Sequence, residues 1–193
     1  MRVGSCRNFS MSDAVVLVAA IALALVAMRS EYLWPDFSGM PTTCSDWLHR
    51  VHYFTFLMTP GFACLSLAVL VLRLRRPRPI LRRLARQPGF VACTATAIVL
   101  GIRMANLASV GGVLRLDLPG HSFWGHILED GMRDSMESIP SDVGCAVAVA
   151  WTIQGLGGRW RPEPSWIDRT GRVLGAFWIA TIPFAYFTYM ING

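Results

Sequence analysis

Five long apolar runs constrain the fold of this chain more than any other feature of its sequence. They cover residues 11–28, 51–72, 89–113, 139–156 and 173–191. A helix needs about 20 mostly apolar residues to cross the hydrocarbon core of a bilayer. None of the runs alternates polar and apolar residues as a half-buried strand does. The sequence therefore predicts a single all-α domain, an integral membrane bundle of about five transmembrane helices.

The overall composition agrees with a membrane protein. Hydrophobic residues make up 53% of the chain and charged residues only 16%, whereas soluble domains carry about 25% charged residues. The five cysteines form no C-x-x-C pair, so we expect neither a disulfide framework nor a zinc ribbon.

The arginines are divided unequally between the two sides of the predicted bundle. All eighteen basic residues are arginine, and seven of them lie in residues 73–88. If that loop is cytoplasmic, the N-terminal segment with two arginines and the loop 157–172 with four are cytoplasmic too. The outer loops, 29–50 and 114–138, hold the four residues Arg29, Arg50, Arg115 and Arg133. Because cytoplasmic loops are enriched in positive charge, we predict a cytoplasmic N-terminus and an outer C-terminus, in a bacterial inner membrane.

The first apolar run has a second interpretation. Arg2 and Arg7 precede a short apolar core, which is also the pattern of a signal peptide. Asp13 at the start of that core, and the lack of a small-residue cleavage site after it, favour an uncleaved helix.

The dense arginine run between the second and third apolar segments predicts contact with the lipid bilayer. Its residues are Arg73, Arg75, Arg76, Arg78, Arg82, Arg83 and Arg86. Each arginine near an anionic membrane surface contributes about 1 kcal/mol of attraction to the headgroups. The run contains no aromatic residue for base stacking, so nucleic acid is not expected as a partner.

One arginine falls inside an apolar run. A charge at the centre of a membrane helix costs about 2.5–3.5 kcal/mol, so Arg103 should face the bundle interior or reach toward the interface. Asp142, in the first turn of the fourth run, lies at a similar depth. We predict a structural buried pair between Arg103 and Asp142.

All four histidines fall on the predicted outer side. His49 and His52 share one helical face, and His121 and His126 lie in the outer segment with Glu129 one turn further on. Imidazole and carboxylate groups can bind zinc or iron, and two facing histidines can bind a haem. These five residues are therefore candidate metal ligands, although interfacial polar residues have the same distribution.

Small residues four apart occur within the fourth run, at Gly144 and Ala148, and at the opening of the fifth, at Gly171 and Gly175. Such spacing lets helices approach closely, so we expect these positions to pack within the bundle.

The function expected from these patterns is that of a non-enzymatic structural or accessory component of a membrane assembly, with other membrane proteins as partners. The sequence contains no H-E-x-x-H or G-x-S-x-G motif and no glycine-rich phosphate loop. A histidine-ligated haem or metal protein with a redox role is the alternative. A small oligomeric transporter is the third interpretation, and the lack of internal repeats weakens it.

Overall fold

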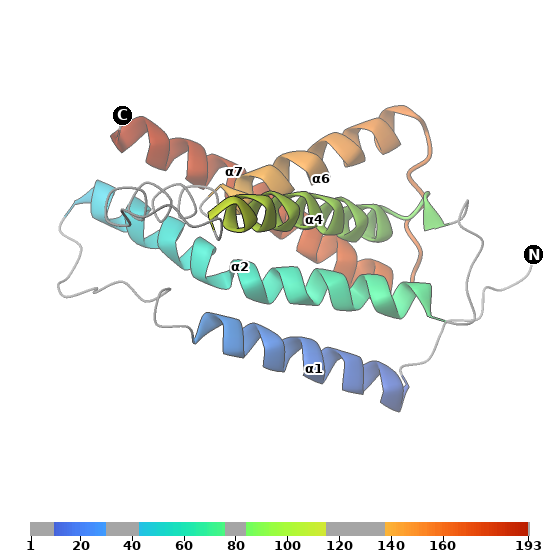
Figure 1. The fold of residues 1–193 in the computed structure, drawn as a ribbon. Helices are drawn as coiled ribbons and strands as arrows, with labels where there is room; N and C mark the ends of the chain where they lie inside the picture. The colour runs from blue at the N-terminus through green and yellow to red at the C-terminus, as the bar shows by residue number, and fades with distance from the viewer. Residues whose placement is uncertain (1–9, 30–42, 76–83, 115–137, 193) are drawn as a thin grey trace, which may run out of the picture.

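The computed structural model describes residues 10–29, 43–75, 84–114 and 138–192, which contain five helices and no strand. The helices are α1 (Met11–Met28), α2 (Cys44–Leu74), α4 (Pro88–Leu114), α6 (Ile139–Leu156) and α7 (Trp166–Asn192) (Figure 1). The prediction of an all-α fold is confirmed for this part of the chain.

Two of the helices are long and apolar enough to cross a membrane. The qualifying segments are Leu57–Leu74 of α2 and Pro88–Asn106 of α4, and α1 contains a shorter apolar segment, Met11–Val26. By length and composition alone, these segments suggest membrane association. The bundle of five spans remains a prediction.

Two helices begin earlier than the sequence predicted. α2 begins at Cys44 rather than at residue 51, and α7 begins at Trp166 rather than at residue 173. Hydropathy locates only the apolar part of a helix, whereas the hydrogen-bonded backbone continues into polar residues. At α7 the Ser165 hydroxyl accepts a hydrogen bond from the Asp168 amide (3.3 Å), which is how an N-cap residue satisfies the first turn. The loops predicted over 29–50 and 157–172 are correspondingly shorter.

Four helices pack around one another, and α1 lies along α2 at the edge of the bundle (Figure 1). One end of the bundle contains the last turns of α2 and α6 and the first turns of α4 and α7. We call it the basic end, because its described residues include seven arginines: Arg73, Arg75, Arg86, Arg159, Arg161, Arg169 and Arg172.

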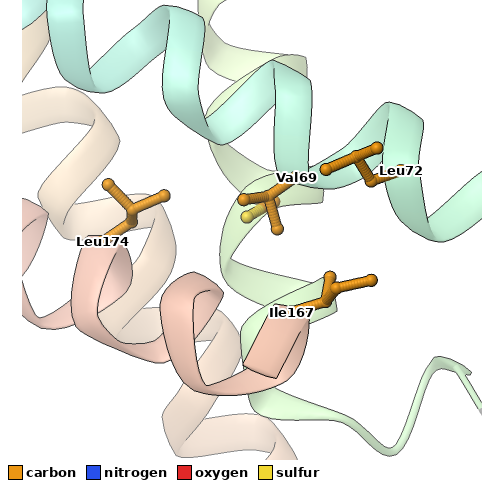
Figure 2. Close-up of a cluster of buried hydrophobic side chains, with 5 residues drawn as sticks. Val69, Leu72, Ile167 and Leu174 are labelled. Carbon is orange, nitrogen blue, oxygen red and sulfur yellow. The ribbon is translucent and has the colours of Figure 1, made fainter. Parts of the chain in front are cut away.

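Two apolar clusters form the core. In the first, Val69 and Leu72 of α2 face Ile167 and Leu174 of α7 (Figure 2), and Cys93 of α4 completes the cluster. The second joins α4, α6 and α7 around Trp178, whose side chain is fully buried. The Trp178 indole donates a hydrogen bond to the Ser66 hydroxyl of α2 (3.3 Å), so its polar atom is satisfied inside the core.

Glycine permits the closest helix contacts. A Cβ atom on Gly144 of α6 would lie 2.3 Å from the Trp178 carbonyl oxygen of α7. One on Gly171 would lie 2.7 Å from the Gly89 carbonyl oxygen, and one on Gly175 would lie 2.5 Å from the Trp151 ring. The prediction that these positions pack inside the bundle is confirmed for the three glycines, while Ala148 of α6 is partly buried.

Candidate functional site

The largest polar cluster of the described residues lies at the basic end. It combines Arg73 at the end of α2, Gln87 just before α4, Glu163 between α6 and α7, and Asp168 in the first turn of α7. Residues from four different segments of the chain therefore meet in one place.

Arg73 is at the centre of this cluster. Its Nε donates a hydrogen bond to Gln87 Oε1 (2.9 Å), and its Nη2 donates to Gln87 Oε1 and to Glu163 Oε2. Gln87 Nε2 also donates to Glu163 Oε2 (2.9 Å). The Arg73 side chain is only 9% exposed and that of Glu163 25%. A guanidinium buried to this degree is costly unless it is paired and hydrogen-bonded, and here it is both.

This environment differs from the lipid-headgroup contact that the sequence predicted for Arg73. α2 continues as a helix through Leu74, so Arg73 lies against the bundle, and its acidic partner comes from 90 residues further along the chain. Arg75 is exposed and Arg86 is partly exposed. The other members of the run, Arg76, Arg78, Arg82 and Arg83, lie outside the described residues.

Asp168 forms the second half of the cluster. Its Oδ1 accepts a hydrogen bond from the backbone amide of Gly89 (3.0 Å), and its Oδ2 accepts one from the amide of Glu163 (3.1 Å). Arg172 Nε lies 3.4 Å from the same Oδ2. The Gly89 amide belongs to the first turn of α4, where amides lack partners within the helix. Asp168 therefore joins the starts of α4 and α7 to the segment between α6 and α7.

A second ion pair lies toward the opposite end of the bundle. Arg103 Nη2 of α4 donates a hydrogen bond to Asp142 Oδ2 of α6. The structure thus brings together the two residues that the sequence analysis paired. Their side chains are 29% and 36% exposed, so the pair is half-buried rather than enclosed by the bundle.

The candidate metal ligands are not assembled by the described residues. His121, His126 and Glu129 lie outside them, and the side chains of His49 and His52, at the start of α2, do as well. In the part of the chain that is described, no three histidine, cysteine or acidic side chains are grouped to hold a metal ion. The haem or metal hypothesis therefore stays a prediction.

The sequence analysis did not select Gln87, Glu163 or Asp168, although one signal for the two acids was present. Only three acidic residues lie on the predicted inner side among thirteen arginines, and the third is Asp13. Asp13 is also fully buried; its carboxylate accepts a hydrogen bond from the Ser10 amide (3.1 Å), while its own amide donates to the Ser10 hydroxyl (3.3 Å). This reciprocal pattern caps α1. The few acidic residues on this arginine-rich side thus occupy structural positions in the fold.

Both polar clusters consist of ion pairs and hydrogen bonds that link one segment of the chain to another. These contacts attach helices and their neighbouring segments to one another. Comparison with known proteins does not identify the family of this chain. The chain matches no protein-family model, no curated relative and no solved structure.

Proposed function

We propose that this chain is a five-span integral membrane protein that acts as a non-enzymatic structural or accessory component of a membrane assembly. The observation that carries the proposal is the distribution of side chains: large apolar residues are exposed on all five helices, while polar residues are buried between them. The core also contains apolar clusters, but buried polar residues together with extensive exposed apolar surface are unusual in a soluble domain.

The exposed apolar residues support embedding in lipid. Examples are Val18 on α1 (65% exposed), Ile98 on α4 (57%) and Val173 on α7 (65%). Within the two candidate spans, only 39% of the α2 segment and 28% of the α4 segment are buried inside the bundle. A core helix of a soluble protein would be mostly buried, because soluble monomers rarely expose large continuous apolar patches.

The buried polar residues support a structural role. Thr96 of α4 donates to a carbonyl within its own helix, and Thr181 of α7 donates to the Pro140 carbonyl of α6 (2.9 Å). The charged groups described above likewise link helices. Since polar groups in lipid must find partners inside the protein, these contacts favour a rigid bundle that presents its outer surface to lipid and to other membrane proteins.

Under this proposal the basic end faces the cytoplasm. The acids Glu163 and Asp168 pair there with Arg73 and Arg172, so they leave the other described arginines of that end free to act as the positive charge that orients a membrane protein.

Extraction of native membranes in mild detergent tests the structural role. We expect the protein to resist carbonate washing and to elute in a complex that contains a different membrane protein at a fixed ratio. Elution of the chain alone, or only with copies of itself, would contradict the role as an assembly component. One iron or zinc per chain, lost when His52 or His126 is replaced by alanine, would instead favour the histidine-ligated alternative.

A further inference from the structure

The ion pair between α4 and α6 does not use all of its polar atoms. Arg103 Nη2 donates to Asp142 Oδ2, and neither charged group has another polar partner among the residues that the structure describes. A guanidinium carries five N–H donors and a carboxylate two acceptor oxygens. Because the two side chains are 29% and 36% exposed, their unused donors and the Asp142 Oδ1 atom are accessible to a molecule outside the bundle.

The pair lies near one end of the apolar part of the bundle. Arg103 is three residues before the end of the candidate span of α4, and Asp142 is in the first turn of α6. Under the proposed membrane location, this is the level where hydrocarbon meets headgroups, on the side opposite the basic end. Polar groups at such a level are stable only when they have partners, so headgroups are the nearest candidates.

The exposed face of α6 begins at Asp142. Val149, Ile153 and Leu156 follow Asp142 by 7, 11 and 14 residues, and this spacing keeps all four on one helical face. The three apolar side chains are 59%, 66% and 86% exposed. Cys145, one turn after Asp142 on the same face, is exposed as well. The charged pair and the apolar surface are therefore contiguous along one side of a single helix.

The length of this face fits an acyl chain. Val149 and Ile153 lie about 10.5 Å and 16.5 Å along the helix axis from Asp142, at 1.5 Å per residue. The hydrocarbon of one leaflet is about 15 Å thick, half of the bilayer core. A lipid whose headgroup contacts the ion pair would thus extend its chains over these two residues.

The two charges of the pair select a headgroup that also carries both signs. Arginine donates paired hydrogen bonds to phosphate oxygens, whereas the neighbouring carboxylate repels a headgroup that is only anionic. An ammonium group next to the phosphate would bind that carboxylate. A primary ammonium has three N–H donors, and the trimethylammonium group of choline has none.

We propose that Arg103 and Asp142 bind the headgroup of phosphatidylethanolamine, whose phosphate contacts the Arg103 guanidinium and whose ammonium donates to Asp142 Oδ1. The acyl chains lie along Val149 and Ile153. The inference rests on the proposed membrane location, and it adds a defined lipid site at the end of the bundle opposite the basic end.

Native mass spectrometry of the full-length protein, released from detergent with phosphatidylethanolamine, phosphatidylcholine or phosphatidylglycerol added, tests the site. We expect phosphatidylethanolamine to be retained best. Asp142→Asn should weaken its retention about tenfold, which corresponds to one charged hydrogen bond. Because Arg103 then has no carboxylate beside it, this variant should retain phosphatidylglycerol better than phosphatidylethanolamine. A purely structural pair would not reverse that order. The control Arg75→Gln, at an exposed position of the basic end, should leave the order unchanged.

A second variant tests the acyl surface without altering the ion pair. Val149→Trp places a large ring across the proposed path of the chains and should weaken retention of phosphatidylethanolamine severalfold. Its matched control is Val18→Trp on α1, since Val18 has a similar exposure of 65%, and it should change retention less than twofold.

Three results would overturn the lipid site. These are equal retention of the three lipids by the unmodified protein, an unchanged order of preference in folded Asp142→Asn, and equal losses in the two tryptophan variants. A thermal unfolding scan shows which variants are folded, and the tryptophan comparison decides if Asp142→Asn is not. Carbonate washing of the same cells tests the membrane location separately, so failure of the proposed function and failure of the lipid site are distinguishable.

Discussion

Arg73 and Arg103 represent two ways in which this protein accommodates a charged side chain between helices. Arg73 is nearly enclosed and is satisfied by both Gln87 and Glu163. Arg103 has one carboxylate partner, Asp142, and both side chains keep about a third of their surface exposed. Arg103 lies within the candidate span of α4, so lipid rather than water would surround the exposed part of its pair, and both ion pairs should contribute to stability.

The first prediction concerns the enclosed pair. Arg73→Ala and Glu163→Ala should each destabilise the protein, and the double variant should lose less than the sum, with a coupling energy of about 1–3 kcal/mol. Thermal or denaturant unfolding in detergent measures the cycle. Arg75→Ala, which removes an exposed arginine two residues away, is the control and should be close to neutral. Additive losses at Arg73 and Glu163 would show that the pair is not coupled.

The second prediction concerns the half-buried pair. Asp142→Ala should leave the charge of Arg103 unpaired within a candidate span and lower stability by about 2.5–3.5 kcal/mol, and exchanging the two charges, Arg103→Asp with Asp142→Arg, should recover most of the loss. The same unfolding measurement applies. A harmless Asp142→Ala, or an exchange as damaging as the sum of its single changes, would mean that the contact does not hold α4 to α6.

At the scale of the helices, glycine positions determine how closely neighbours approach. Gly144 has the backbone of α7 directly against it, whereas Gly155, on the same helix, has nothing within 4 Å of the position a Cβ would take. A methyl group at the first position must push α6 away from α7, and at the second it meets open space. Since overpacking typically costs about 1–3 kcal/mol, the two glycines provide a matched comparison.

The third prediction follows from that comparison. Gly144→Ala should lower the free energy of unfolding by about 1–3 kcal/mol. Gly155→Ala should be neutral or slightly stabilising, because alanine is the better helix former. Unfolding curves of the two variants in the same detergent give the difference. Equal stability of both variants would contradict the close packing of α6 on α7.

At the scale of the whole molecule, the helices run back and forth between the basic end and the opposite end of the bundle (Figure 1). α2 has 31 residues and is therefore about 46 Å long, which is close to the full thickness of a bilayer with its headgroup regions. The basic end collects the arginines of several segments, and the bundle between the ends exposes apolar side chains.

Local patterns predicted the helices well and the contacts unevenly. The bounds of α1 and α6 agree with the apolar runs, because only one or two polar residues precede the apolar part of each helix, whereas the longer polar starts of α2 and α7 were missed. The Arg103–Asp142 pair was predictable because a charge inside an apolar run demands a partner at the same depth. The pairing of Arg73 with Glu163 was not, because nothing local in the sequence reports a contact between residues 90 positions apart.

We propose that this bundle crosses a membrane with its basic end on the cytoplasmic side, and cysteine labelling tests this topology most directly. In a background whose five cysteines are replaced, single cysteines at Thr43, before α2, and at Arg159, after α6, report the two ends. A membrane-impermeant thiol reagent applied to intact cells should label Thr43→Cys at once and Arg159→Cys only after permeabilisation. Labelling of both positions from outside, or the reverse order, would contradict the account.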